Sequence, residues 1–292
     1  MKIKSYAKVN LYLEVLKKRK DNYHQIITLF ERISLCDEIW IIPRPDNRIR
    51  IICSHPGLPL GKTNLAWRAA ELLKRGLSIK KGVDIKIDKR IPLASGLGGG
   101  SSNAASVLLG LNRLWKLNLN KKKLIFYGKK LGCDVPFFLA DASFAIGAQR
   151  GDEIKALTTV KRSFWHVLAA PKIRVSTRLV YKRLDAIFRP SIIGLTKSKG
   201  DVKIFIQRLK RAGLGLVQES LFNRLESVTF GLYPEVKKLK ETMADSGIGE
   251  AILMSGSGPA IFSLVSSKKE AMALYRYLSG SGKWKVFLAK TT

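Results

Sequence analysis

A run of glycines and serines in the first half of the chain has the composition of a phosphate-binding loop. Its residues are Pro92, Leu93, Ala94, Ser95, Gly96, Leu97, Gly98, Gly99, Gly100, Ser101 and Ser102. Glycine has no Cβ, so consecutive backbone N–H groups can turn toward one anion and approach its oxygens closely. A helix predicted to begin at residue 101 adds unpaired N–H groups and about half a positive elementary charge at its start. The run therefore predicts binding of the phosphates of a nucleotide.

Two common nucleotide motifs are disfavoured by the same residues. No Lys followed by Ser or Thr closes the run, so it is not a Walker A loop, and three adjacent glycines followed by two serines fit a Rossmann fingerprint poorly. A flexible linker is the bland alternative. Linkers, however, do not usually open directly into an apolar helix after a strand. A phosphate cradle of another type is the favoured interpretation.

Lys8 and Asp134 are two charged residues whose positions in the sequence could do chemistry. Lys8 lies on the polar face of an alternating strand at 5–16, with Asn10 two residues further on the same face. Asp134 stands where the chain leaves a predicted helix, and an aspartate there can act as a base, kept ionised by a nearby ammonium. The alternatives are a solvated lysine on a strand and an aspartate that caps the next helix.

The elements that must position these residues alternate between strands and helices. Strands are predicted at 26–35, 38–42 and 49–53 as an antiparallel meander, followed by a helix at 64–75 capped by Thr63 or Asn64, and a strand at 83–89. Helices follow at 101–115 and 121–131. Further strands are expected at 143–147 and 164–169.

The second half of the chain repeats this mixture. Helices are predicted near 177–184, 202–212, 235–246 and 268–278, and strands at 252–255, 260–265 and 284–289. A chain of 292 residues exceeds what one hydrophobic core usually serves. We therefore expect an α+β protein with two domains, at 1–160 and 161–292.

Composition narrows the class of protein. No apolar run approaches the roughly 20 residues that cross a bilayer, and the first residues lack the apolar segment of a signal peptide, so a cytoplasmic protein is expected. The three cysteines have no metal-binding spacing, which suits reduced thiols. The net charge of +31 would attract nucleic acid, an anionic membrane or a phosphorylated metabolite, and charge alone does not decide among them.

Three stretches resemble the motifs of the GHMP kinases, a family named for galactokinase, homoserine kinase, mevalonate kinase and phosphomevalonate kinase. They are residues 7–11, the run at 92–102 and residues 255–262, in family order along almost the whole chain. The chain departs from the pattern at Tyr6, where proline is common, and at Asn22, where glycine is common. These departures loosen the local backbone match and leave the chemistry intact.

The resemblance implies a fold, a phosphate donor and a catalytic pair. The fold is the two-domain GHMP kinase fold, with an N-terminal domain resembling ribosomal protein S5 domain 2, a ferredoxin-like C-terminal domain and the active site between them. The donor is ATP with Mg²⁺, bound by residues 92–102. The pair is Lys8 and Asp134, with Asp134 as the base at the acceptor hydroxyl.

Within the family, residues 21–24, 95–105 and 132–137 are most similar to members that phosphorylate the 2-hydroxyl of a cytidine diphosphate-linked methylerythritol in non-mevalonate isoprenoid synthesis. The substrate-binding residues implied are Asn10, Tyr23, His24, Thr177 and Tyr181. Aromatic rings would stack on the pyrimidine and His24 would hydrogen-bond it, although each tyrosine could instead be a core residue with its hydroxyl at the rim. Asp152 is a weaker candidate.

No protein ligand is predicted for Mg²⁺. Ser101 or Ser102 could touch the ion, but no second carboxylate has a convincing place in the sequence. Mg²⁺ commonly keeps several waters and binds substrate phosphates.

Two other functions stay open at this point. The loop does not exclude a GHMP kinase acting on another alcohol, such as homoserine or a mevalonate derivative, which has no pyrimidine to stack. The basic clusters at 17–20, 121–123 and 129–130 suggest nucleic acid, but no recognisable RNA- or DNA-binding module accompanies them. We expect ATP and a small cytidine diphosphate substrate as partners, no nucleic acid and no membrane, and a monomer or homodimer.

Overall fold

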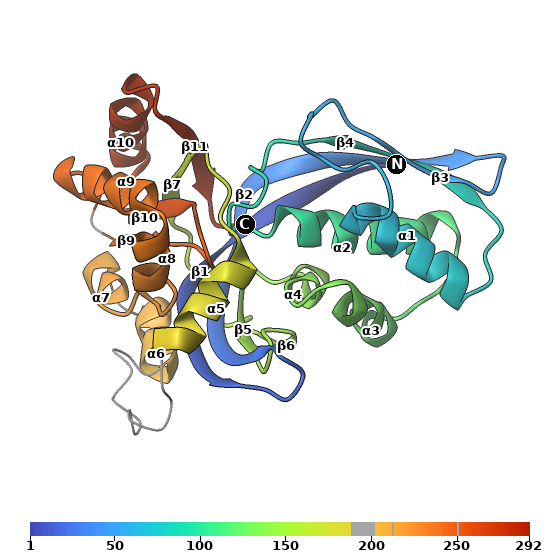
Figure 1. Ribbon diagram of the computed structural model, residues 1–292, viewed down its shortest axis with the longest axis horizontal. Helices are drawn as coiled ribbons and strands as arrows, with labels where there is room; N and C mark the ends of the chain where they lie inside the picture. Colours follow the sequence, from blue (N-terminus) through green and yellow to red (C-terminus); the bar gives the residue numbers. More distant parts are fainter. Residues whose placement is uncertain (188–201, 212, 250) are drawn as a thin grey trace.

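Two β-sheets with their covering helices make up the molecule (Figure 1). The computed structural model describes residues 1–187, 202–211, 213–249 and 251–292. In these residues the larger sheet has seven strands in the order β3-β4-β2-β1-β8, with β5 paired to β2 and β6 paired to β5. Its strands are β1 (Lys2–Lys18), β2 (His24–Arg44), β3 (Ile49–Ile52), β4 (Gly82–Asp88), β5 (Phe144–Ala148), β6 (Glu153–Ala156) and β8 (Phe222–Asn223). The α+β class predicted from the sequence is confirmed.

The long hairpin of β1 and β2 is the centre of the larger sheet. The strands pair antiparallel from Lys2 opposite Trp40 to Lys18 opposite His24. The strand predicted at 5–16 is confirmed within β1, but the two strands predicted at 26–35 and 38–42 are one continuous strand. A register shift beside Tyr6 and Ala7 absorbs the irregularity that the sequence pattern suggested was a break.

The antiparallel meander predicted for the first strands is wrong at β3. This strand pairs with β4, and the pairing is parallel. The connection between them contains helix α1 (Leu65–Gly76), and a parallel pair requires such a crossover because a short turn cannot join two strands that run the same way. The residue before this helix, Asn64, accepts a hydrogen bond from the Ala66 amide and is the helix cap.

Four helices lie on one side of the larger sheet (Figure 1). Besides α1 they are α2 (Gly99–Leu114), α3 (Lys121–Leu131) and α4 (Val135–Ala140). Helix α2 is the central one, since it packs against β1 and β2 as well as against the other three helices. It begins at Gly99, two residues before the predicted start, so Gly99 and Gly100 of the glycine run lie in its first turn.

The smaller sheet has the order β11-β7-β10-β9 in the described residues, with every pair antiparallel. Its strands are β7 (Trp165–Pro171), β9 (Ala251–Met254), β10 (Ile261–Val265) and β11 (Trp284–Lys290). The helices of this half are α5 (Thr177–Ile187), α6 (Val202–Arg211), α7 (Leu214–Gln218), α8 (Glu226–Leu232), α9 (Pro234–Asp245) and α10 (Lys268–Gly280). The four strands and four helices predicted here are confirmed, except that Ala212 lies outside the described residues; the short α7 and α8 were not predicted.

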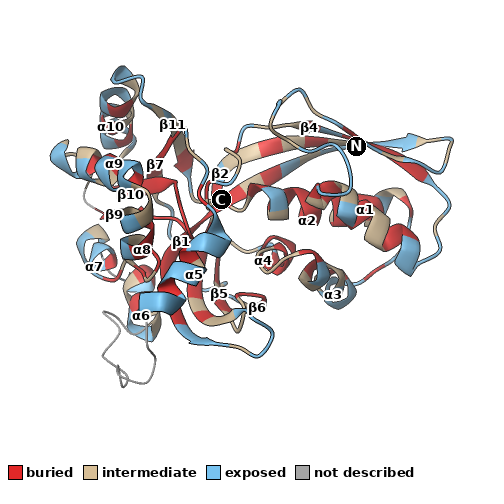
Figure 2. Cartoon of the chain, viewed as in Figure 1, coloured by how far each residue is buried: buried red, intermediate tan, exposed pale blue. Residues whose placement is uncertain are grey.

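One group of packed buried residues takes members from both sheets, and buried segments of both sheets are red in Figure 2. Val9 and Leu11 of β1 pack in one core with Leu168 of β7 and Phe262 of β10. Strand β8 adds a parallel pair to β1 from the second half of the chain. The middle of β1 is therefore fixed from both sides, which makes it a rigid base for the side chains of a site.

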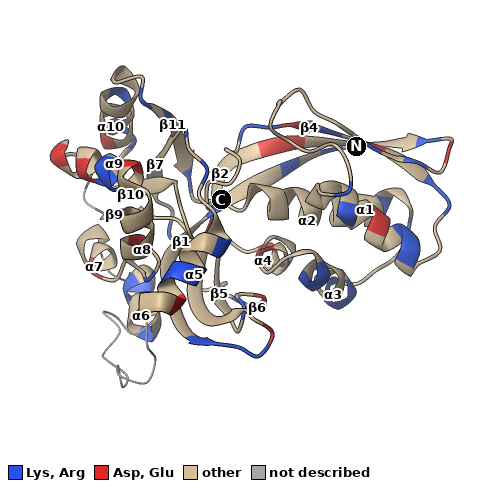
Figure 3. Cartoon of the chain, viewed as in Figure 1, with Lys and Arg blue, Asp and Glu red and all other residues tan. Residues whose placement is uncertain are grey.

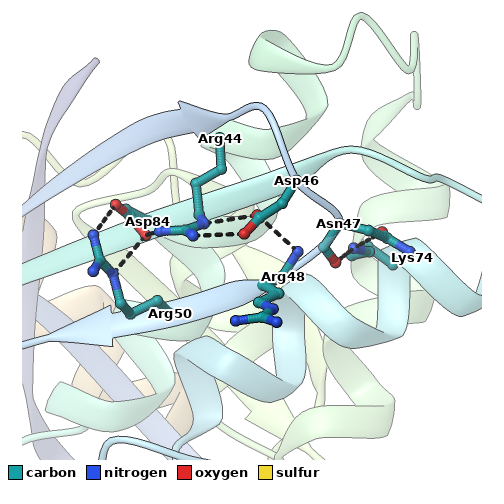
Figure 4. Close-up of polar contacts among 7 residues, drawn as sticks. All are labelled: Arg44, Asp46, Asn47, Arg48, Arg50, Lys74 and Asp84. Atoms are coloured by element: carbon teal, nitrogen blue, oxygen red, sulfur yellow. Dashed lines mark hydrogen bonds and ion pairs between the residues drawn. The ribbon is translucent and has the colours of Figure 1, made fainter.

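A network of charged residues holds the turn between β2 and β3 (Figure 4). Asp84 accepts from Arg44 and Arg50, and Arg44 also pairs with Asp46. The hydrogen bonds from Arg44 and from the Arg48 amide hold the pKa of Asp46 well below its usual range. Lys74 of α1 donates to the Asn47 carbonyl oxygen, so the helix and the turn are tied together.

Lys and Arg residues occur on elements in all parts of the molecule rather than on one face of the view (Figure 3). They include the basic residues of α3 and those of the turn between β1 and β2. Among the described helices, none has both the length and the apolar character needed to span a membrane. The three cysteines are unpaired by disulfides.

Candidate active site

A cleft of about 840 Å³ lies where the phosphate-binding run meets β1, α5 and the loop between β9 and β10. It is lined by most of the residues that the sequence analysis singled out. Those are Lys8, Asn10, Tyr23, His24, Ala94, Gly96, Gly98, Asp134, Thr177 and Tyr181. The cleft therefore brings together residues that are far apart in the sequence.

The glycine run has the backbone of an anion cradle. Gly96 and Gly98 have φ values of +78° and +70°, and Ala94 has +50°. Gly98 caps α2, and the first hydrogen bond of that helix runs from the Ser102 amide to the Gly98 carbonyl. The amides of Gly99, Gly100 and Ser101 therefore have no partner inside the helix, which is the arrangement that binds phosphate oxygens.

Replacing Gly96 with alanine is expected to lower the free energy of unfolding by about 1–3 kcal/mol, the usual range for overpacking, and to raise the KM for ATP. A Cβ at this position would lie 2.1 Å from the Ser255 carbonyl oxygen, and the φ of +78° disfavours an L side chain as well. Urea unfolding and ATP titration of the rate measure the two effects.

Gly100→Ala is the matched control for stability. A Cβ there would meet only Leu65 Cδ1 at 3.6 Å. Because Gly100 lies inside the first turn of α2, alanine should leave stability unchanged or raise it by about 0.4–1 kcal/mol. Equal stabilities of the two variants would contradict the tight approach of Gly96 to Ser255.

Asp37 anchors both ends of the cradle, and the sequence analysis missed it. Its buried carboxylate accepts from the Arg90 and Ile91 amides, both at 2.8 Å, just before the glycine run. It also accepts from Lys89 Nζ at 2.6 Å and from Asn103 Nδ2 at 2.8 Å, just after the run. Burial lowers the pKa of Lys89 although Asp37 opposes that shift. One carboxylate thus fixes the entry and exit of the loop.

The two serines at the end of the run have different surroundings. Ser102 is buried and its hydroxyl accepts from Ser5 Oγ at 2.8 Å, while Ser5 in turn accepts from Asn103. Ser101 is only half-buried, and a Cβ on Gly132 would lie 3.8 Å from its hydroxyl oxygen. In the described part of the chain no side chain bonds Ser101 Oγ. Ser101 rather than Ser102 therefore has a hydroxyl available to a phosphate or its metal ion.

Lys8 and Asp134 face each other in the cleft. The Lys8 ammonium lies 3.8 Å from Asp134 Oδ2 and donates to Asn10 Oδ1 at 2.6 Å and to the Gly96 carbonyl at 2.7 Å. Burial lowers the pKa of Lys8, and Asp134 counteracts that shift. Lys8 is 3% exposed, so the alternative of a solvated strand lysine is wrong.

Asp134 occupies the position before α4 without capping it. Its side chain makes no capping hydrogen bond, which contradicts the alternative of a purely structural aspartate at this helix start. The carboxylate is about one-third exposed at 34%, toward the cleft that it lines. A carboxylate beside a buried ammonium, with no other side-chain partner among the described residues, is a suitable base for a hydroxyl group.

The loop between β9 and β10 closes the cleft over Lys8. A Cβ on Gly256 would lie 3.4 Å from Lys8 Nζ and from Asn10 Oδ1, so the backbone of this loop approaches the pair closely. Asn223 holds the loop by donating to the Met254 and Gly256 carbonyls, at 2.7 and 2.8 Å. Nothing in the sequence around Asn223 indicated this role.

The other end of the cleft contains the aromatic residues. The rings of His24 and Tyr181 lie 4.9 Å apart with an angle of 30° between their planes. Burial raises the pKa of Tyr181, so its hydroxyl stays protonated. Tyr23 is half exposed at the rim, where Arg150 lies 5.0 Å from its ring centre. These rings provide a flat, partly open surface of the kind on which a base stacks.

Thr177 and Asp152, two further residues predicted from the sequence, each contact a neighbouring polar side chain. Thr177, at the start of α5, shares a hydrogen bond of 2.7 Å with Ser257 of the loop between β9 and β10. Asp152 is paired with Arg150 at 2.5 Å and is buried. Asp152 therefore orients Arg150 beside Tyr23 and is not among the residues that line the cleft.

Comparisons with known proteins identify the family. The chain matches the GHMP kinases N terminal domain at residues 64–142 and the GHMP kinases C terminal domain at 209–283. It is 40% identical over 278 residues to the 4-diphosphocytidyl-2-C-methyl-D-erythritol kinase of Exiguobacterium sibiricum, covering 95% of this chain and 93% of that one, and 39% identical to that of Bacillus subtilis, covering 95% and 92%.

A solved structure gives the same result over the whole chain. The crystal structure of a 4-(cytidine 5'-diphospho)-2C-methyl-D-erythritol kinase superposes with a TM-score of 0.81 at 33% identity, covering 99% of this chain and 98% of that one. The two-domain fold implied by the sequence motifs is confirmed. The chain belongs to the GHMP kinase family and, within it, to the 4-diphosphocytidyl-2-C-methyl-D-erythritol kinases.

Proposed function

We propose that this protein transfers the γ-phosphate of ATP to the 2-hydroxyl of 4-diphosphocytidyl-2-C-methyl-D-erythritol, giving the 2-phosphate and ADP, in the non-mevalonate route to isoprenoid precursors. The observation that carries the proposal is one cleft lined by Ala94, Gly96 and Gly98 of the glycine run, by the Lys8 and Asp134 pair and by the His24 and Tyr181 rings. Enzymes of that name that are 39–40% identical over 95% of this chain support the same reaction.

The reaction assigns a role to each part of the cleft. The free amides at the start of α2 bind phosphate oxygens of ATP, and the rings hold the pyrimidine at the other end. Asp134 takes the proton of the 2-hydroxyl as its oxygen attacks the γ-phosphorus, and the bond from that phosphorus to the bridging oxygen of ADP breaks. Lys8 lies 3.8 Å from Asp134 and offsets negative charge that develops between donor and acceptor.

ATP use follows from membership in the kinase family, and we propose that Mg²⁺ accompanies it. Among the described residues no group of three His, Cys, Asp or Glu side chains could hold a metal ion. Mg²⁺ suits such a site because it keeps several waters and binds substrate phosphates. The Ser101 hydroxyl is the side chain that fits as a protein contact, and the ion would supply neutralisation of phosphate charge.

The remaining assignments rest on this function. We propose a division of the chain into an ATP-binding part at 1–160 and a C-terminal part at 161–292. The larger sheet takes all its described strands except β8 from the first part, and the smaller sheet takes its strands from the second. We also propose that the protein acts in the cytoplasm as a monomer or homodimer. Its partners would be ATP and 4-diphosphocytidyl-2-C-methyl-D-erythritol, called the cytidyl alcohol below.

The proposed function is tested by ADP release from Mg-ATP with three acceptors: the cytidyl alcohol, homoserine and mevalonate. Turnover is expected with the cytidyl alcohol alone, because a small aliphatic acceptor leaves the His24 and Tyr181 rings unoccupied. Turnover of homoserine or mevalonate instead would keep a kinase and contradict the acceptor. Release of no ADP with any acceptor would contradict the kinase activity itself.

A further inference from the structure

Helix α5 presents a carboxylate as well as a ring to His24. Asp185 and Tyr181 stand four residues apart, and side chains at that spacing lie on one face of a helix. Asp185 Oδ1 lies 2.5 Å from His24 Nε2, and the Tyr181 ring lies 4.9 Å from the His24 ring. All three side chains line the cleft. The motifs that predicted the rings did not include Asp185.

Lys18 completes this cluster on the other carboxylate oxygen. Its ammonium donates to Asp185 Oδ2 at 2.7 Å, and Lys18 pairs with His24 in the register of β1 and β2. Asp185 therefore bridges the base of the turn that carries Tyr23. Burial alone would raise the pKa of Asp185, but the hydrogen bonds from Lys18 and His24 outweigh it and lower that pKa. The carboxylate is ionised at neutral pH.

An ionised carboxylate only accepts hydrogen bonds, so His24 must carry a proton on Nε2. In a neutral imidazole the other nitrogen, Nδ1, is then an acceptor. Lys18 balances the charge of Asp185 from the side of the other carboxylate oxygen. Since Nε2 is occupied, Nδ1 is the ring nitrogen of His24 that remains for a base in the cleft.

Cytosine and uracil differ at the edge that an acceptor meets. Cytosine carries an exocyclic amine, which donates, where a uracil ring carries a carbonyl oxygen, which accepts. An acceptor nitrogen binds the amine and is repelled by the carbonyl oxygen. We infer that Asp185 is a positioning residue that fixes the His24 tautomer and so sets the preference of the cleft for cytosine over uracil, an inference that rests on the proposed function.

The tautomer can be observed directly. The chain has three histidines, so the imidazole ¹⁵N spectrum is simple and a His24→Gln variant assigns the signals of His24. The wild-type protein is expected to show a proton on Nε2 and an acceptor at Nδ1. In Asp185→Ala the two tautomers are expected to mix. A wild-type His24 that carries its proton on Nδ1, or on both nitrogens, would overturn the inference.

Base preference is measured with cytidine and uridine diphosphates as inhibitors that compete with the cytidyl alcohol at saturating ATP. Loss of one fixed hydrogen bond is worth about 0.5–1.5 kcal/mol. The inhibition constant of uridine diphosphate divided by that of cytidine diphosphate should therefore fall up to about tenfold in Asp185→Ala. The KM for the cytidyl alcohol should rise by a similar factor, with kcat and the KM for ATP unchanged. A purely structural role would not lower the ratio selectively.

Asp141→Asn is the matched control. Asp141 also pairs with a cation, Arg32, at 2.5 Å, but it does not line the cleft. Its positive φ of 52° suits asparagine, so the fold should tolerate the change. The control should keep the wild-type ratio. If Asp185→Ala keeps that ratio while the wild type turns over the cytidyl alcohol, the positioning role is wrong and the proposed function stands; if the wild type does not turn it over, both are wrong.

Discussion

An Asp134→Asn protein is expected to lose about 10²–10⁴-fold in kcat, the usual contribution of general acid–base catalysis, with little change in the KM for ATP. The amide has the shape of the carboxylate and cannot take the proton of the acceptor hydroxyl. Asp134 makes no capping bond to α4, and among the described residues its ion-pair partner is Lys8 at 3.8 Å. The variant should therefore bind both substrates and fold normally. Steady-state ADP release at saturating ATP and acceptor measures the loss.

The structure also defines what the same variant does to Lys8. Because Asp134 counteracts the effect of burial on the pKa of Lys8, its removal should lower that pKa further. Lys8 keeps its hydrogen bonds to Asn10 and to the Gly96 carbonyl, so its position should not change. Asp141→Asn, on an aspartate outside the cleft, serves as the control and should retain full turnover. A kcat of Asp134→Asn within tenfold of wild type would show that the transfer needs no base here.

The parts of this site that act through backbone composition were predictable from the sequence. A phosphate cradle needs several residues without side chains next to a helix start, and that requirement leaves a local signature at Gly96, Gly98 and Gly99. Lys8 was visible as a charge inside an alternating strand. The roles of Asp134, His24 and Tyr181 came from resemblance, since one aspartate before a proline or one tyrosine on a helix carries no such signature by itself.

The supporting residues could not be predicted because their partners are distant in sequence. Asp37 bonds residues that follow it by more than fifty positions, and Asn223 bonds a loop about thirty positions away. The pattern around Asp37 was even misleading. The two strands predicted at 26–35 and 38–42 left Asp37 outside both, whereas β2 continues through it with the carboxylate buried. A strand pattern does not show that a carboxylate inside the strand accepts hydrogen bonds from four donors in distant parts of the chain.

The net charge of the whole chain, in contrast to these supporting residues, can be counted from the sequence but does not identify the function. The excess of +31 suggested a polyanion as partner, and ATP with a cytidine diphosphate compound satisfies that description as well as nucleic acid does. Lys and Arg are distributed over elements of both halves (Figure 3). What separated the alternatives was the small set of residues in one cleft and the relatives that the chain matches.

An Asp37→Leu protein is expected to lose about 3–5 kcal/mol in the free energy of unfolding, the cost of breaking a buried ion pair on one side. Lys89, whose side chain is 1% exposed, would remain as a buried ammonium that, among the described residues, keeps the Ile91 carbonyl as its one hydrogen-bond partner. The Arg90 and Ile91 amides and the Asn103 side chain would lose an acceptor as well. Urea unfolding measures the loss, and the KM for ATP should rise because the cradle is no longer held at both ends.

Lys89→Met on the other side of the same pair should be less destabilising. It leaves Asp37 with three hydrogen bonds, two from backbone amides and one from Asn103, and a buried carboxylate with several such donors remains stable in its charged form. Methionine also fills much of the space of the lysine stem. If Lys89→Met costs as much as Asp37→Leu, the ion pair itself would be the important interaction. A smaller cost for Lys89→Met would show that Asp37 acts mainly by collecting the backbone amides and the helix α2 side chain that shape the phosphate cradle.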